Sequence, residues 1–160
     1  MPFIPNELRM SRLYNAPRPL VWKVWTDPKH LAQWWGPFGA ARTTCEMDFR
    51  VGGEFRVLMT TPEGQTVPAA GEFLEIVEPE RIVYEGDARA PTDCGCGLPP
   101  KARVEVLFEA VREKTRLEIF TRFPDEAALI AANAAGFSTS WNKTLDEMAP
   151  YLQRLMENER

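Results

Sequence analysis

The stretch GFSTSWNKTLDEMAPYLQRL, residues 136–155, decides the fold class. Its apolar residues recur at steps of three and four, which predicts one long amphipathic helix with a single apolar stripe. Pro150 lies inside this pattern. Because proline lacks a backbone N–H and clashes with the preceding turn, we expect the helix to kink or split near Asp146–Pro150. The stripe consists of Phe137, Trp141, Leu145, Met148, Leu152 and Leu155.

Before this helix, residues 43–123 contain five or six short segments in which apolar and polar residues alternate. Such alternation is typical of half-buried strands. In the first segment, Cys45, Met47 and Phe49 share one face. Short turns such as Gly52-Gly53 favour antiparallel pairing of these strands, with one face of the sheet in water.

The opposite face of that first segment carries Asp48 and Arg50, two residues apart. Side chains at this spacing point to the same side of a strand. We expect an exposed ion pair there, which would contribute little to stability.

One more alternating segment lies near the start of the chain, around residues 8–14, and two short helical segments follow it. Asp27 suits the N-cap of the second helix, with Pro28 at its first position. We expect this helix to run to Trp35, where Gly36-Pro37 stops it. The order of elements is therefore a strand, two short helices, a run of antiparallel strands and a long helix.

This order predicts an α+β fold in a single domain spanning residues 1–160. A curved antiparallel sheet needs its apolar face covered, and the long C-terminal helix is the only predicted element of sufficient length. We therefore expect the sheet to wrap around that helix and to leave a space between the two.

The bulk composition excludes some classes of protein. A net charge of -4 over 160 residues argues against a nucleic-acid binder with a broad basic surface. No apolar stretch is long enough to span a bilayer, and the first ten residues lack the apolar core of a signal peptide. Three cysteines do not make a secreted disulfide framework. The default expectation is a cytoplasmic protein.

Four segments of the chain, in order, resemble one family. They are DPKHLAQWWGP, MDFRVGGEFRV, GEFLEIVEPERIVYE and GFSTSWNKTLDEM. They are similar to the successive signatures of the Aha-type domains, homologues of the activator of the ninety-kilodalton heat-shock protein ATPase. These domains belong to the START (SRPBCC, polyketide-cyclase-like) superfamily. The resemblance extends from about Leu8 to Leu155.

The resemblance implies the helix-grip fold, in which a sheet wraps the C-terminal helix around a mostly apolar cavity. Members of the superfamily bind lipids or other hydrophobic small molecules, cyclise polyketides or act on chaperones. Aromatic and methionine side chains would make an adaptable lining for such a cavity. The candidate lining residues are Trp34, Trp35, Met47, Phe55, Met59, Phe73, Tyr84, Phe108 and Trp141.

The same side chains could instead fill the space as an ordinary core, because the spacing of a core and the spacing of a pocket are identical in sequence. Trp34 and Trp35 cannot both point the same way, since adjacent helical positions are about a hundred degrees apart. We expect one indole to pack the short helix onto the sheet and the other to face the cavity entrance or a partner.

His30 is the chain's one histidine and the obvious candidate for a general base. No triad signature, metal-ligating histidine pair or nucleophile elbow accompanies it, so we interpret it as a solvated helix residue. The predicted inward positions include no carboxylate, because Glu54, Glu72 and Glu105 fall on the opposite faces of their strands. Glu75 is the exception if a bulge shifts the register of its strand.

Cys94 and Cys96 lie in a Gly/Pro-rich segment, TDCGCGLPP, that the family pattern does not supply. With Asp93, His30 or Cys45 they could form a metal site, but a C-x-C pair lacks the spacing of a structural zinc site. A redox role is conceivable in an exposed loop. The simpler interpretation is an insertion loop, which could act as a lid if it lies at the cavity mouth.

We interpret the chain as a binding protein for a hydrophobic or amphipathic small molecule, with no cofactor, metal or catalytic residue of its own. No nucleic-acid partner and no membrane insertion are expected, and a homodimer is possible. Two alternatives stay open. One is a cyclase- or hydratase-like enzyme that uses the same cavity, and the other is a module that contacts a chaperone and stimulates its ATPase.

Overall fold

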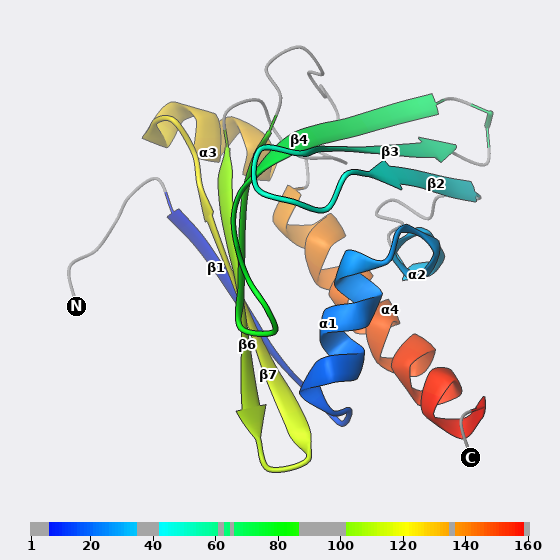
Figure 1. Ribbon diagram of the computed structural model, residues 1–160. Coiled ribbons are helices and arrows are strands. Elements are labelled where there is room, and N and C mark those ends of the chain that lie inside the picture. The colour runs from blue at the N-terminus through cyan, green and yellow to red at the C-terminus, as the bar shows by residue number, and fades with distance from the viewer. Residues whose placement is uncertain are drawn as a thin grey trace.

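The computed structural model describes residues 7–34, 42–60, 63–64, 66–86, 102–134 and 137–158. Within these residues the chain forms seven strands and four helices (Figure 1). The strands are β1 (Glu7–Tyr14), β2 (Arg42–Met47), β3 (Glu54–Thr60), β4 (Thr66–Val77), β5 (Arg81–Gly86), β6 (Arg103–Val111) and β7 (Lys114–Arg122). The helices are α1 (Arg18–Thr26), α2 (Pro28–Trp34), α3 (Glu126–Ala134) and α4 (Phe137–Asn158).

The described strands form one antiparallel sheet in the order β1-β7-β6-β5-β4-β3-β2. Strands β2 to β7 follow their order in the chain, whereas β1 pairs with β7 at the far edge. The sheet curls, so that α1 and α4 lie on its concave side (Figure 1). This is the predicted helix-grip architecture, an α+β fold with two short helices after the first strand.

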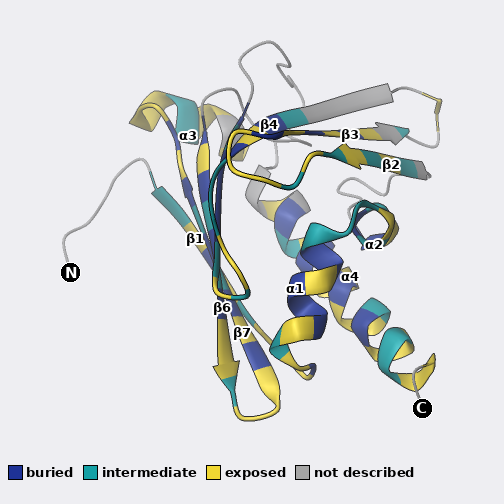
Figure 2. Ribbon diagram, viewed as in Figure 1, coloured by how far each residue is buried: buried dark blue, intermediate teal, exposed yellow. Residues whose placement is uncertain are grey.

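Alternation of buried and more exposed residues gives the sheet its two faces. In β6, Val104, Val106 and Phe108 are buried, while the residues between them are half-buried. The buried positions face the helices, and the exposed positions form the outer face of the sheet (Figure 2). The apolar face of α4 covers the inner face, and its Leu145 and Met148 are 1% and 0% exposed.

A β-bulge in β4 lets two apolar residues face the core with two residues between them. Phe73 lies opposite Tyr84, and Ile76 lies opposite Ile82, with the register shift between Phe73 and Glu75. A bulge adds one residue to one strand of a pair. The extra residue allows both Phe73 and Ile76 to pack inward.

Two predictions about the start of the second short helix are confirmed. The Asp27 carboxylate accepts a hydrogen bond of 2.9 Å from the backbone N–H of Lys29, and α2 begins at Pro28. Strand β2 ends at Met47, earlier than the alternation predicted. Phe49 nevertheless packs inward, with its ring centroid 5.1 Å from that of Phe73.

Helix α4 runs without interruption from Phe137 to Asn158, although Pro150 lies inside it. Of the two predicted outcomes near Asp146–Pro150, a kink or a split, the split is therefore wrong. Met148 and Leu152, on either side of the proline, are 0% and 2% exposed. Their packing holds both halves of the helix on the same core, which offsets the hydrogen bond that the proline cannot donate.

Pro150→Ala is expected to raise the free energy of unfolding by about 2 kcal/mol, because the exposed proline leaves one helical hydrogen bond unmade. For a chain of this size the melting temperature should rise by about 4 to 8 °C. Thermal melts of parent and variant, followed by circular dichroism, would measure this rise in melting temperature. Gln153→Ala, at another exposed position of α4, is the control and should change little. A Pro150→Ala protein no more stable than the parent would contradict the argument.

Polar contacts fix α4 against β1. The Tyr14 hydroxyl donates a buried hydrogen bond of 2.7 Å to the carbonyl oxygen of Leu145. The Arg12 guanidinium donates to the Asn142 amide oxygen at 2.7 Å and to the Asp146 carboxylate at 3.1 Å. These contacts join residues about 130 positions apart in the chain and set the position of the helix along the sheet.

At the other end of β1, the Glu7 carboxylate receives hydrogen bonds from Arg9 at 2.8 Å and from Arg122 at 3.2 Å. Burial raises the pKa of Glu7, but these two guanidinium groups outweigh it, so the pKa lies below its usual value of 4.5. A carboxyl with a lowered pKa in the folded state stabilises the fold above the unfolded-state pKa. That contribution disappears as the pH falls through the folded-state pKa.

We therefore expect Glu7→Gln to destabilise the protein more at pH 7 than at pH 3. Urea unfolding of parent and variant at pH 7, 5 and 3 would measure the difference. Glu109→Gln is the control, because Glu109 lies 3.7 Å from Arg116 in a pair that is largely exposed. Equal destabilisation by Glu7→Gln at all three pH values would contradict the expectation.

Candidate functional site

The inner face of the sheet carries a small apolar pocket beneath α1 and α2. Its walls come from one side chain of each helix and from strands β2 to β5. The volume left between these side chains is about 20 Å³. The lining residues are Trp25, Leu31, Met47, Phe55, Val57, Phe73, Ile82 and Tyr84.

A cavity of this size has room for about one water molecule. Pockets that take drug-sized ligands have volumes of about 300–1,000 Å³. The inner pocket is thus nearly filled by its own lining side chains.

Aromatic rings make up the floor of the pocket. The Phe55 ring centroid lies 5.2 Å from that of Phe73 and 5.2 Å from that of Tyr84. Gly71 allows this arrangement, because a Cβ at that position would lie 2.7 Å from the Phe55 ring. The close approach of backbone and ring explains why the strand carries a glycine there.

Two polar groups belong to residues of this otherwise apolar lining. The Trp25 indole N–H is buried and has no hydrogen-bond partner in the part of the chain that the structure describes. The Tyr84 hydroxyl belongs to a buried side chain of the same lining. Burial raises the pKa of Tyr84 well above its usual value of 10, so the hydroxyl keeps its proton. Both groups are neutral hydrogen-bond donors.

The structure brings four of the nine predicted lining residues together at this pocket, namely Met47, Phe55, Phe73 and Tyr84. Trp34, Phe108 and Trp141 are buried in the same core but do not line the pocket. Met59 lies on β3, where its side chain is not described, and Trp35 lies outside the described residues.

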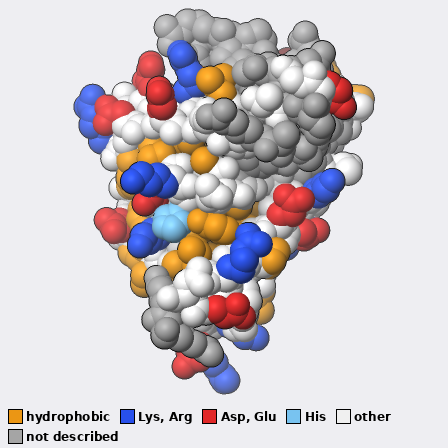
Figure 3. Space-filling model, turned by 90° about the vertical axis from the view of Figure 1, so that its right-hand side faces the viewer, with side chains coloured by type: hydrophobic (Ala, Val, Ile, Leu, Met, Phe, Trp, Pro, Cys, Tyr) orange, Lys and Arg blue, Asp and Glu red, His pale blue; other side chains and the backbone are white. Residues whose placement is uncertain are grey.

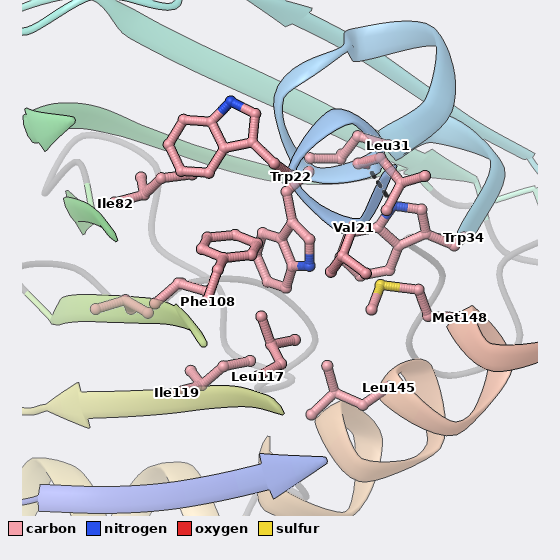
Figure 4. Packing of buried hydrophobic residues seen from close by; sticks show 14 of the residues in the cluster. Val21, Trp22, Leu31, Trp34, Ile82, Phe108, Leu117, Ile119, Leu145 and Met148 are labelled. Atoms are coloured by element: carbon pink, nitrogen blue, oxygen red, sulfur yellow. Dashed lines mark hydrogen bonds between the residues drawn. The ribbon is translucent and has the colours of Figure 1, made fainter. Parts of the chain in front are cut away.

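Trp34 packs the two short helices together. Its indole N–H donates to the carbonyl oxygen of Val24 at 2.8 Å, and its ring centroid lies 4.8 Å from that of Trp25 (Figure 4). Trp34 is 2% exposed. In these contacts Trp34 packs α2 onto α1, whereas the prediction placed one of the paired indoles against the sheet.

His30 lies on the surface of the molecule, beside hydrophobic side chains (Figure 3). It is half-buried, and its Nδ1 atom shares a hydrogen bond of 2.6 Å with the Tyr151 hydroxyl. Burial and the nearby Asp27 carboxylate raise the pKa of Tyr151, so its hydroxyl can donate to Nδ1. The histidine is less solvated than predicted, and it connects α2 to α4.

The carboxylates of the described residues lie away from the inner pocket. The bulge that would affect Glu75 is present, yet the Glu75 carboxylate accepts a hydrogen bond of 3.0 Å from Arg81 and lines a hollow on the outer face. Asp48 and Arg50 form the predicted exposed ion pair, at 2.7 Å. General acid–base chemistry would need a titratable group at the pocket, and the described lining has only the Tyr84 hydroxyl.

Of the cysteines, only Cys45 lies within the described residues, where it is free and half-buried. Burial and the nearby Glu46 raise the pKa of its thiol to about 11. Cys94, Cys96 and Asp93 lie outside the described residues. Within the described part of the chain, no group of three or more His, Cys, Asp or Glu side chains could hold a metal ion.

Sequence reasoning missed four lining residues: Trp25, Leu31, Val57 and Ile82. Trp25 and Leu31 lie on the predicted short helices, and Val57 lies on the inward face of its strand. The spacing therefore predicted that Trp25 and Val57 are buried. The spacing does not distinguish the residues that line the inner pocket from the other residues of the core.

Residues 15–153 match the protein family described as "Activator of Hsp90 ATPase homolog 1-like protein". No protein with a curated description matches the chain. No helix among the described residues has the length and apolar character needed to cross a membrane.

Several solved structures have the same fold. Protein NE0264 from Nitrosomonas europaea is 24% identical, with a TM-score of 0.77, and the match covers 97% of this chain and 96% of that one. Protein Ms6760 from Mycobacterium smegmatis is 20% identical, with a TM-score of 0.81 and coverage of 94% and 93%. A protein from Arthrobacter aurescens is 23% identical, with a TM-score of 0.81 and coverage of 94% and 87%. At these identities the likeness concerns the fold alone.

Proposed function

The chain belongs to the family of activator of Hsp90 ATPase homolog 1-like proteins, and on this basis we propose that it binds one small, uncharged, mostly apolar molecule at the inner pocket. The observation that carries the proposal is the pair of neutral donors in the apolar lining. The Trp25 indole N–H has no hydrogen-bond partner among the described residues, and the Tyr84 hydroxyl is buried in the same lining. Buried polar groups are normally hydrogen-bonded, so a ligand that carries an acceptor would complete the site.

The lining also defines the chemistry of the ligand. Burial of apolar surface would drive binding, and one acceptor oxygen, such as that of a ketone, ether or alcohol, would orient the molecule. A charged ligand is disfavoured, because the described lining offers no opposite charge and an unpaired charge is costly to bury. The proposal concerns binding rather than turnover, since the lining contains no carboxylate and no histidine among the residues that the structure describes.

A ligand must make room for itself, since the space left between the side chains is about 20 Å³. Met47 is the side chain best suited to move. It is half-buried, and it lies on β2, the strand at the edge of the sheet. Methionine is unbranched and adapts its shape more readily than other apolar residues. We therefore expect the ligand to enter at the Met47 side and to displace this side chain.

Acetophenone and ethylbenzene make a matched pair of probes, because they share shape but only acetophenone carries an acceptor oxygen. Titration of each into the labelled protein, followed by backbone amide chemical shifts, would locate and quantify binding. We expect shifts at β3 and β5, and acetophenone should bind about 2- to 10-fold more tightly. Tyr84→Phe should reduce this preference.

Met47→Ala should strengthen the binding of both probes, because it enlarges the pocket. Leu58→Ala is the matched control, since Leu58 is exposed on the other face of β3. The proposal fails if neither probe shifts the pocket amides in the parent or in Met47→Ala. It also fails if ethylbenzene binds as tightly as acetophenone in the parent.

A further inference from the structure

The outer face of the sheet carries a second hollow, of about 350 Å³, on the side away from the helices. Its floor consists of Leu74, Val83 and Phe120, and we call it the outer groove. Its volume falls within the range of known small-molecule sites. Val83 is 6% exposed, although it is separate from the core cluster beneath the sheet. Val83 is thus sheltered from water although it lies on the outer face of the sheet.

The bulge in β4 helps to build this floor. It gives Leu74 and Glu75 adjacent places at the groove, while Phe73 and Ile76 pack on the core side. Without the extra residue, the side chains would alternate strictly, and only one of Leu74 and Glu75 would point outward. The groove therefore depends on a local feature of the backbone.

Three arginines and three glutamates surround the floor, and the glutamates are already engaged. Arg81 contacts Glu75 at 3.0 Å and Glu105 at 2.6 Å. Glu7 contacts Arg122 at 3.2 Å, and it also contacts Arg9 at 2.8 Å. The Glu7 side chain is only 7% exposed.

Arg103 differs from the other two arginines of the groove, Arg81 and Arg122, which contact its glutamates. Arg103 lies directly opposite Arg122 on β7 and directly opposite Glu85 on β5. Among the described residues, no carboxylate lies within ion-pair distance of its guanidinium. Like charges in directly opposite positions of a sheet repel each other. The buried Nε atom of Arg81 also has no hydrogen-bond partner in the described chain. The groove thus offers more donors than its own carboxylates use.

We propose that the outer groove binds a small amphipathic carboxylate. The carboxylate group lies between Arg103 and Arg122, and the apolar part lies on Val83 and Phe120. Phe120 is two residues from Arg122 on the same face of β7, and Val83 pairs with Glu105, two residues from Arg103. A guanidinium matches a carboxylate in geometry and binds it through two parallel hydrogen bonds.

The glutamates around the groove select for a single negative charge. A phosphate monoester carries nearly two charges at neutral pH, and Glu7, Glu75 and Glu105 would repel the second one. An uncharged molecule would leave Arg103 and Arg122 facing each other without an anion. This site is on the opposite face of the sheet from the inner pocket, so it does not depend on the function proposed above.

Hexanoate, hexanamide and hexyl phosphate test the assignment as probes of similar length. Titrations at pH 7.5, followed by the amide shifts of Val83, Glu105 and Phe120, would locate the binding. We expect hexanoate to bind about tenfold more tightly than hexanamide, and more tightly than hexyl phosphate. Binding of hexanoate should weaken as sodium chloride is raised.

Arg103→Gln should weaken hexanoate about tenfold. Arg116→Gln is the matched control, because Arg116 is exposed on β7 and pairs with Glu109 outside the groove. Thermal melts would check that both variants fold, and Arg103→Lys, which keeps the charge, should restore part of the affinity.

The proposal is overturned if Arg103→Gln and Arg116→Gln weaken hexanoate binding equally. It is also overturned if hexanamide or hexyl phosphate binds as tightly as hexanoate. A third contrary result would be that hexanoate shifts only the amides of the inner pocket.

Discussion

Gly53→Ala is expected to lower the free energy of unfolding by about 3–4 kcal/mol, although it adds a single methyl group. A Cβ atom at this position would overlap the backbone carbonyl oxygen of Asp48 and would come within 3.0 Å of that of Arg50. Both obstacles are backbone atoms, which cannot rotate away as a flexible side chain can. The loop between β2 and β3 would have to open.

That loop also anchors β4. The Gly53 N–H donates to the carbonyl oxygen of Arg50 at 2.8 Å, and the Gly53 carbonyl accepts from the N–H of Phe73 at 2.9 Å. The N–H of Gly52 donates to the carbonyl of Phe73 at 2.8 Å. Displacing the loop would therefore loosen Phe73, which lines the inner pocket. We expect the loss of stability to be accompanied by altered chemical shifts at the pocket.

Gly52→Asn is the matched control in the same turn. Gly52 has a φ of +85°, and a Cβ there would meet no atom within 4 Å. Asparagine tolerates the left-handed region, so this change should cost about 1 kcal/mol or less. Urea unfolding of the parent and both variants would decide the matter. If Gly53→Ala were as stable as Gly52→Asn, the steric explanation would be wrong.

The second large effect is expected from Leu145→Ala, which should lower the free energy of unfolding by about 3–4 kcal/mol. Leu145 is 1% exposed and points from α4 toward Leu117 of β7 (Figure 4). Truncation would remove apolar contacts and leave a cavity between helix and sheet. Because hydrogen bonds from Arg12 and Tyr14 of β1 hold α4 in place beside Leu145, the surroundings can collapse only in part.

Two further variants separate packing from hydrogen bonding at this point. Tyr14→Phe removes the donor to the backbone carbonyl of Leu145 and should cost about 1 kcal/mol. Lys143→Ala, at an exposed position of the same helix, should have almost no effect. Urea unfolding of the three variants would rank them. A loss below about 1 kcal/mol for Leu145→Ala would show that α4 packs less closely than the structure indicates.

The sequence allowed the architecture to be predicted because the relevant signals are periodic. The stripe from Trp141 to Leu155 could only be a long helix, and alternation in the strands could only be satisfied with one face buried. Pro150 misled the prediction, because local propensity argued for a break that packing of Met148 and Leu152 overrides. Tertiary contacts routinely outweigh such local preferences.

The candidate site was less predictable, and the reason is geometric. Phe55 and Phe108 occupy equivalent inward positions in their strands, and both are buried, yet only Phe55 borders the inner pocket. The difference depends on the curl of the sheet and on where α1 and α2 lie, neither of which has a local signature. The outer groove depends on the bulge after Phe73, which suspends the alternation that the prediction used.

The pairing of β1 with β7 has a consequence for biosynthesis. Glu7 and Arg122 are 115 positions apart in the chain, yet they lie side by side at one edge of the sheet. Ribosomes add about 5–20 residues per second. At that rate about 6–23 s pass between the synthesis of Glu7 and that of Arg122, and during this time β1 has no β7 to pair with. Contacts this distant in sequence also slow refolding, which places completion of the sheet among the late events of folding.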